Sequence, residues 1–411
     1  VGWMHLLALE LDDALAAFNE ATTLWNTHGD REGYALGLKN LGLAYGRSGQ
    51  LKRSAMCYDA SIRVSWEIAN KGTELEATWG RAVVHADAGE IERARELLDK
   101  TVLRAREQKQ PRLEALALAD QARLLASEGE GSRGLRAVRR ARALARELSE
   151  PALSAHVTLR AAEVELMRGA LAPAVDAFRL RSSWLSASPD RTLSLLAELG
   201  CGQALVALGD LSGASDALEA TRREASARGL RPLEARALLA QGRLALAEAL
   251  QRGHKPGRLV VASPELGRAR AAFKEARAIA RECEAESLRN HSRLGLARIA
   301  LLEGAAEVAE ATLNAVAAEA GSDQREVRAE IAALLAELAL ARDPELALVR
   351  ADEVDAGSPQ RRLELSLLRA EACEQSGRSL EARASLQEGS AALDELRKGL
   401  EEADRRLLEQ T

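Results

Sequence analysis

The chain has 411 residues and a net charge of −5, from 57 lysines and arginines against 62 aspartates and glutamates. This mixed charge gives the chain as a whole no general attraction to nucleic acid or to a membrane surface. Hydrophobic residues make up 47% of the chain but aromatic residues only 3%. Much of the apolar content is therefore alanine and leucine, the two residues with the strongest helix preference.

Further classes of protein are excluded by what the sequence lacks. No apolar run is long enough to span a membrane, and no secretory signal pattern opens the chain. The four cysteines, Cys57, Cys201, Cys283 and Cys373, are far apart and form no metal-binding motif. We therefore expect reduced thiols in a cytoplasmic protein.

The first element of order is a repeat with a period of forty residues. A fixed period of this length indicates one supersecondary unit stacked many times. Each unit is too small to bury its own apolar face, so its neighbours must complete the core. The period is marked by five glycines: Gly49, Gly89, Gly129, Gly169 and Gly209.

Each unit reads as a pair of helices. Residues 31–47 have a helical stripe of apolar side chains, 48–50 form a glycine turn, and a second helix begins at 51. A small residue stands seven positions before each turn glycine and a large one nine positions after it. The small residues are Gly42, Ala82, Ala122, Ala162 and Gly202, and the large ones are Tyr58, Leu98, Val138, Phe178 and Leu218.

This order of small and large positions resembles the tetratricopeptide repeat (TPR). The forty-residue length is similar to that of arrays in bacterial signalling proteins, such as the effector-sensing region of the maltose-regulon activator and arrays attached to serine/threonine kinases. The resemblance implies an all-α fold, an α-solenoid of antiparallel helix hairpins in a right-handed superhelix, with about nine to ten repeats.

The repeat frame also predicts how the chain is divided. Because the chain opens partway through a unit and Val1 is not an initiator methionine, we expect a piece of a longer protein. The predicted segments are a truncated repeat over 1–30, five regular repeats over 31–230, a repeat with an insertion at 250–264 over 231–285, degenerate and C-terminal repeats over 286–378, and a long capping or coiled-coil helix over 379–411.

The last segment carries a heptad pattern. Apolar or small residues alternate three and four positions apart, as in a coiled-coil seam. The seam either covers the last repeat or joins two copies of the chain in a homodimer. Its members are Leu386, Gly389, Leu393, Leu396, Leu400, Ala403 and Leu407.

No motif in the sequence indicates catalysis. The six histidines are not spaced as metal ligands, and no hydrolase, phosphate-loop or kinase signature occurs. The stretch Gly129–Gly134 matches the dinucleotide pattern GxGxxG, but a helix precedes it where that pattern needs a strand. We therefore expect no enzyme activity, no cofactor and no metal.

The resemblance implies that the first helix of each unit lines a concave groove. Leucines there would form an apolar floor edged by alternating charge, which suits a helix or an extended peptide, unless the leucines pack between helices instead. Trp79 is the strongest anchor candidate. The candidate partner-binding residues are Lys39, Trp79, Arg123, Glu163, Gln203, Arg243, Arg298 and Glu371.

The sequence thus favours a non-catalytic scaffold that binds a protein or peptide. We expect it within a larger bacterial signalling or regulatory protein, and its 49 arginines against 8 lysines are typical of a GC-rich genome. The alternative is an effector-sensing region of a multidomain kinase or transcription activator that binds a small ligand. Nucleic-acid binding through the arginine-rich stretch 133–146 is least favoured, because no aromatic side chain is interleaved for base stacking.

Overall fold

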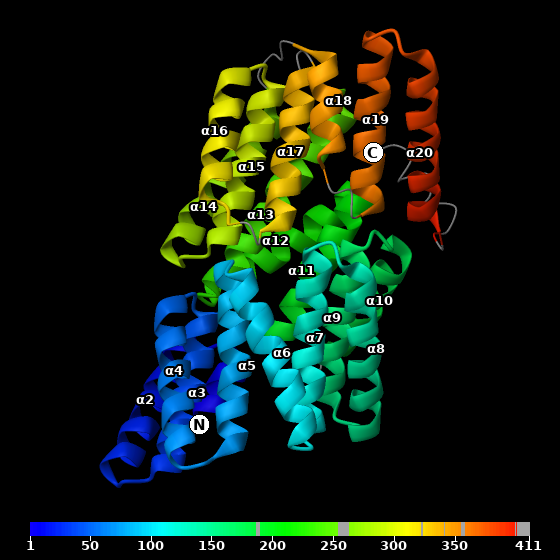
Figure 1. Ribbon diagram of the computed structural model, residues 1–411. Coiled ribbons are helices and arrows are strands. Elements are labelled where there is room, and N and C mark those ends of the chain that lie inside the picture. The colour runs from blue at the N-terminus through cyan, green and yellow to red at the C-terminus, as the bar shows by residue number, and fades with distance from the viewer. Residues whose placement is uncertain are drawn as a thin grey trace.

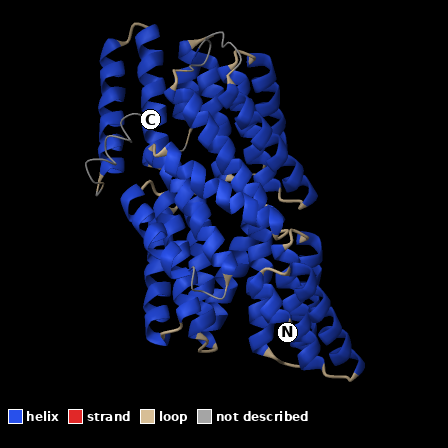
Figure 2. Cartoon of the chain, turned by 180° about the vertical axis from the view of Figure 1, so that it is seen from behind, coloured by secondary structure: helices blue, strands red, loops and turns tan. Residues whose placement is uncertain are grey.

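The computed structural model describes residues 1–185, 190–253, 263–321, 324–340, 342–354, 358–398 and 400, with the backbone alone for 180–185. Throughout these residues every regular element is an α-helix, and short turns join most of the twenty helices (Figure 2). The predicted all-α solenoid of about nine to ten repeats is therefore confirmed. None of the described helices is both long and apolar enough to cross a membrane.

The helices of the first half are α1 (Gly2–Ala8), α2 (Leu11–Thr27), α3 (Arg31–Arg47), α4 (Leu51–Glu67), α5 (Lys71–Ala88), α6 (Ile91–Glu107), α7 (Pro111–Ser127), α8 (Gly131–Leu148), α9 (Pro151–Met167) and α10 (Leu171–Leu185). Those of the second half are α11 (Arg191–Leu208), α12 (Leu211–Ala227), α13 (Arg231–Gln251), α14 (Pro264–Glu282), α15 (Glu286–Leu302), α16 (Ala306–Glu319), α17 (Arg325–Leu340), α18 (Pro344–Asp352), α19 (Pro359–Gln375) and α20 (Ser379–Arg397).

Each odd-numbered helix packs on the even-numbered helix that follows it, which gives ten hairpins from α1–α2 to α19–α20. Successive odd-numbered helices from α3 to α19 also contact one another, whereas successive even-numbered helices make far weaker contacts or none. The odd-numbered helices therefore form the inner layer of the curved stack, and the even-numbered helices form its outer layer.

Large side chains on the outer helices pack between successive hairpins. The ring of Phe273 on α14 lies against Gly242 on α13 and Gly295 on α15, where a Cβ atom would come within 2.5 Å of the ring. Tyr58 on α4 occupies the same kind of space beside Gly42 and Gly80. One large residue thus fills the space between its own hairpin and the next, which is why the sequence alternates small and large positions at a fixed spacing.

The ten hairpins are arranged in two tiers. Figure 1 shows α2 to α9 in a lower tier and α13 to α20 in an upper tier, with α11 and α12 near the junction. Three turn glycines of the lower tier face helix starts of the upper tier. Gly49 of the second hairpin faces Pro232 of the seventh, Gly89 of the third faces Ser287 of the eighth, and Gly169 of the fifth faces Pro359 of the tenth. The superhelix therefore returns over itself after about five hairpins.

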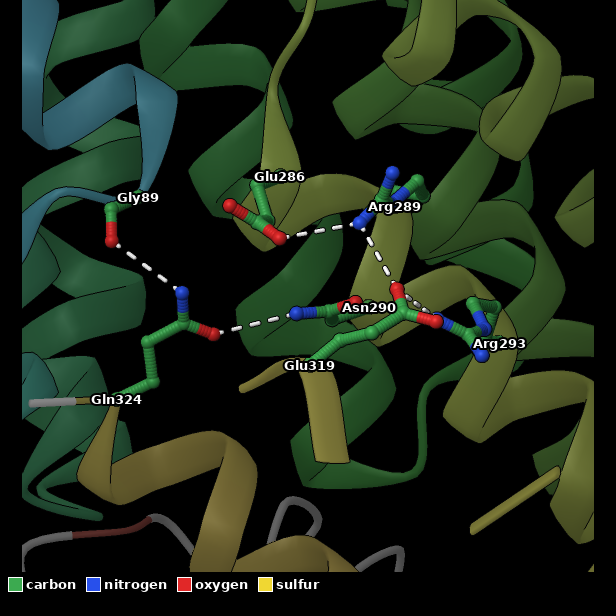
Figure 3. A network of polar contacts seen from close by, with 7 residues as sticks. All are labelled: Gly89, Glu286, Arg289, Asn290, Arg293, Glu319 and Gln324. Carbon is green, nitrogen blue, oxygen red and sulfur yellow. Dashed lines mark hydrogen bonds and ion pairs between the residues drawn. The ribbon is translucent and has the colours of Figure 1, made fainter. Parts of the chain in front are cut away.

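Hydrogen bonds accompany this tier contact. The side-chain amide of Gln324 donates to the carbonyl oxygen of Gly89 at 3.3 Å and accepts from the Asn290 amide at 3.2 Å (Figure 3). Elsewhere along the contact Arg228 donates to the carbonyl oxygen of Ala8 at 2.8 Å, although 220 positions separate the two residues in the sequence. The contact therefore involves backbone groups as well as apolar surface.

A buried carboxyl group also lies at the tier contact. Glu128, at the end of α7, is 6% exposed and accepts a hydrogen bond from the backbone of Arg325 at the start of α17. Burial raises the pKa of Glu128 to about 7, and the charge of Glu326 adds to this effect, while Arg95 and Arg325 oppose it. The folded chain therefore holds this proton more tightly than an exposed glutamate would.

The C-terminal helix α20 packs on its own chain. Gly389 lies against Ser366 of α19, Leu396 is 2% exposed and lies beside Gly169, and Leu400 is also buried. Most of the described seam is thus buried against its own chain and is not free to join a second copy, so this packing does not support the homodimer, one of the two alternatives that the heptad pattern left open. The helix ends at Arg397; Ala403 and Leu407 lie outside the described residues, as does most of the predicted insertion at 250–264.

The tier contact predicts different costs for one substitution at two turn glycines. Gly89 and Gly129 both have positive φ, +89° and +80°, so alanine at either position costs about 1–2 kcal/mol in backbone strain. At Gly89 the new Cβ would also lie 3.0 Å from the backbone nitrogen of Ser287, whereas at Gly129 it would meet no described atom within 4 Å. Thermal unfolding should show a clearly larger decrease in melting temperature for Gly89→Ala than for Gly129→Ala. Equal decreases would contradict the tier contact.

The raised pKa of Glu128 predicts a pH dependence of stability. Between the unfolded pKa of about 4.5 and the folded pKa of about 7, the folded state binds more protons, so stability falls as pH rises through this window. Glu128→Gln should remove that fall. At pH 8 it should raise the urea midpoint, and the corresponding gain in the free energy of unfolding should be at most about 3 kcal/mol. Urea titrations of the unmodified chain and of the variant at pH 5 and pH 8 test this. The prediction is refuted if the free energy of unfolding falls between pH 5 and pH 8 by the same amount in both proteins.

Candidate binding surface on the inner face

A carboxylate on α7 joins three inner helices. Asp120 accepts hydrogen bonds from the Trp79 indole on α5 at 2.9 Å and from Arg160 Nε on α9 at 2.7 Å. His156 Nε2, also on α9, lies 3.5 Å from the same carboxylate. Asp120 is only 3% exposed, so these partners replace the water that a buried charge loses.

The network continues from α9 to the upper tier. Arg160 donates to Glu163 at 2.8 Å, and the guanidinium of Arg236 on α13 lies 3.6 Å from the Glu163 carboxylate. Asp87 on α5 and Arg123 on α7 lie within electrostatic range of the same groups. The eight residues of this central cluster are Trp79, Asp87, Asp120, Arg123, His156, Arg160, Glu163 and Arg236.

Neighbouring charges set the ionisation of the cluster. Burial alone would raise the pKa of Asp120, but the positive charge of Arg160, together with the neighbouring His156, outweighs it and holds that pKa well below its usual value. The pKa of Glu163 is lowered against burial in the same way, chiefly by Arg160. Both carboxylates are thus ionised at neutral pH and held in place by Arg160.

Two members of the central cluster have no direct partner among the described residues. Arg123 makes no ion pair, and its Nε is buried without a hydrogen-bond partner. Asp87 is open to solvent, yet the surrounding protein raises its pKa by desolvation, against the charges of Arg123, Arg236 and Arg160. Arg123 and Asp87 are thus the two titratable groups of the central cluster without a direct ion-pair partner among the described residues.

A second group of charges lines the inner helices of the upper tier. Arg298 on α15 is surrounded by Glu330 and Glu337 of α17 and Glu364 of α19, and these carboxylates raise its pKa although burial opposes them. Burial raises the pKa of Glu337, and Glu371 adds to that effect. The members of this C-terminal cluster are Arg243, His291, Arg298, Glu330, Glu337, Arg361, Glu364 and Glu371.

The candidate residues from the sequence are distributed over these groups. Trp79, Arg123 and Glu163 meet in the central cluster, and Arg243, Arg298 and Glu371 lie in the C-terminal cluster. Lys39 instead pairs with Glu76 at 2.5 Å, and Gln203 is half-buried and belongs to neither cluster. Trp79 differs from the exposed anchor that the sequence suggested, because it is half-buried and its N–H is bonded to Asp120.

The groove positions of the repeat did not indicate the residues that hold the central cluster together. Asp120 and Arg160 both stand two positions before the small residue of the inner helix, where the other regular repeats have Asn40, Gly80 and Gly200. A charge at a position that is uncharged in the other regular repeats is a signal that could have identified them. His156 and Arg236 likewise share one position of the repeat frame, six residues before the small residue.

Other candidate chemistry in the described residues is limited. His5, Glu10 and Asp13 have ligand atoms within 4.8 Å of one another, but all three are at least partly exposed and His5 is hydrogen-bonded to Glu10 at 2.6 Å. The four cysteines are free thiols, with Cys283 and Cys373 buried and the other two half-buried.

Substitutions at a paired and at an unpaired inner charge should change stability by very different amounts. Asp120→Asn removes the charge that Arg160 faces, and breaking a buried pair of this kind costs about 3–5 kcal/mol. Arg123→Gln removes a guanidinium without a direct partner and should change stability by less than about 1 kcal/mol. Thermal unfolding of both variants measures the difference, and a loss for Arg123→Gln as large as that for Asp120→Asn would show that Arg123 has a structural role.

Known proteins resemble this chain in structure more than in sequence. No protein-family model and no curated protein matches the sequence. Among solved structures, a Rap protein complexed with Competence and Sporulation Factor has a TM-score of 0.61 at 12% identity, and the match covers 89% of this chain and 98% of that one. A human IFIT1 dimer with m7Gppp-AAAA has a TM-score of 0.52 at 12% identity, covering 94% of each chain. The chain therefore has the fold of TPR-type helical repeat proteins.

Proposed function

We propose that the chain is a non-catalytic scaffold whose inner face binds a peptide or protein segment that carries both acidic and basic groups. The observation that carries this proposal is the pair of free charges at the central cluster, Arg123 and Asp87. On this proposal a carboxylate of the partner binds Arg123, and a basic group of the partner binds Asp87 or the glutamates of the C-terminal cluster.

Arg123 supplies the energetic basis for binding. Its Nε is buried and makes no hydrogen bond within the described chain. Leaving a buried polar group unsatisfied costs about 1–3 kcal/mol, and more when the group is charged. A partner carboxylate or carbonyl oxygen at Arg123 would remove that cost, so binding energy is available at this position before any apolar contact is counted. Other inner cations, such as Arg160, already have carboxylate partners.

The balance of charge favours a peptide over a nucleic acid. The two clusters together hold seven carboxylates and six arginines. A surface that binds phosphates needs an excess of cations, and seven carboxylates would repel them. IFIT1 shares the fold and is found with m7Gppp-AAAA, but these inner charges suit the mixed charges of a polypeptide better.

The regulatory setting forms part of the proposal. The Rap protein with the same fold is found in complex with Competence and Sporulation Factor, which supports a role in which binding to the inner face controls a larger bacterial signalling or regulatory protein. An effector-sensing region that binds a small ligand remains the alternative, since the free charges at Arg123 and Asp87 could also hold a small zwitterion.

A library of short random peptides, displayed and selected on the purified chain, tests the proposal. Selected peptides should contain both an acidic and a basic residue. Arg123→Gln should weaken their binding at least tenfold, because a charge-assisted hydrogen bond contributes about 1.5–3 kcal/mol. Arg136→Gln on the outer helix α8 is the matched control, since Arg136 is exposed and distant from both clusters in the repeat frame.

Two results would contradict the proposal. One is that no peptide is enriched, or that the enriched peptides bind the Arg123→Gln and Arg136→Gln variants equally well. The other is that free amino acids, which are small zwitterions, raise the melting temperature of the chain as much as the selected peptides do. The second result would favour the small-ligand alternative, because a ligand of the native state stabilises it in proportion to its affinity.

A further inference from the structure

A basic groove lies on the upper tier, apart from the two inner clusters. Its walls carry Lys274, Arg277 and Arg281 of α14 and Arg289 and Arg293 of α15, and its volume is about 590 Å³. Glu319 at the end of α16, together with Glu282 and Ala278, completes its lining. Neither inner cluster contributes to this groove, so a role for the groove is independent of the proposed function.

The carboxylates of the groove are already bound. Glu319 accepts from Arg289 at 3.0 Å and from Arg293 at 2.7 Å, and Arg289 also donates to Glu286 at 3.0 Å (Figure 3). Glu282 is paired with Arg231 at 2.5 Å. The arginines of α15 are therefore held in fixed positions by carboxylates, and the acidic groups of the groove are not available to neutralise α14.

The three cations of α14 have no such partners. Within the described residues Lys274, Arg277 and Arg281 are exposed and form no ion pair. They stand at i, i+3 and i+7, so they lie along one face of the helix, where neighbouring like charges repel each other. The free chain bears this repulsion, and a partner with negative charges at a similar spacing would relieve it.

We propose that this groove docks an acidic helical segment of a partner protein, with carboxylates of that segment bound to Lys274, Arg277 and Arg281. The groove itself shows the chemistry, because Arg289 and Arg293 already bind a carboxylate that arrives from a neighbouring helix. A nucleic acid fits less well, because none of the lining residues is aromatic and bases would have nothing to stack on.

The experiment uses a fluorescein-labelled alanine-based helical peptide with glutamates at i, i+3 and i+7, and the same peptide with glutamine in their place. Fluorescence anisotropy should show saturable binding of the glutamate peptide alone, which weakens as salt is added. Arg277→Glu/Arg281→Glu should weaken binding by tenfold or more, because two attractive contacts become repulsive. Arg136→Glu/Arg139→Glu, the same charge change on an exposed face of α8, should leave binding unchanged.

Controls separate a loss of binding from a loss of folding. Circular dichroism and thermal unfolding of both double variants establish that each is folded. The proposal is overturned if the glutamate peptide does not bind, if both double variants bind it as the unmodified chain does, or if both lose binding equally. It is also overturned if a single-stranded oligonucleotide of equal charge binds the groove more tightly than the peptide, which would assign the groove to nucleic acid.

Discussion

The structure depends on the contact between its two tiers. A stack of helix hairpins could remain an open curve, but here the turns of the second, third and fifth hairpins rest on the seventh, eighth and tenth. The turn glycines make this possible in two ways: positive φ lets each inner helix end sharply, and the missing side chain lets the next tier approach to van der Waals distance. Three of the five glycines that mark the period, Gly49, Gly89 and Gly169, thus also determine how closely the superhelix closes on itself.

The return of the superhelix over itself determines which charged residues meet on the inner face. Arg236 belongs to the first helix of the seventh hairpin, and it reaches Glu163 of the fifth across the junction of the tiers. Charges from α5, α7, α9 and α13 therefore influence one another although more than a hundred residues separate Asp87 from Arg236. Asp120, Arg160 and Glu163 satisfy each other, whereas Arg123 and Asp87 have no direct ion-pair partner among the described residues. This division between paired and unpaired charge is the physical basis for separating structural residues from binding candidates.

Much of the fold could be predicted from the sequence, because a fixed period reports local geometry. Gly42 and Tyr58, or Gly242 and Phe273, pack within one hairpin or onto the next, so their spacing is visible in one dimension. The tier contact is different: it depends on small rotations accumulated over five hairpins, and nothing local to Gly89 indicates Ser287. The central cluster was found only in part, since Trp79, Arg123 and Glu163 follow the groove positions of the repeat while Asp87 and Arg236 meet only after the superhelix closes. The heptad pattern of α20 left two interpretations open for a similar reason, because a seam that packs on α19 and a seam that packs on a second copy have the same spacing.

Small-angle X-ray scattering of the purified chain tests the closed two-tier superhelix most directly. A closed superhelix should give a scattering profile that matches the two-tier arrangement, with a single compact radius of gyration. That radius should be unchanged between low and high salt, because backbone hydrogen bonds and apolar packing hold the tiers together. A larger radius, or a profile that requires a mixture of open and closed shapes, would contradict closure. In that case Arg236 and Glu163 would not share one surface, and the central cluster would not form.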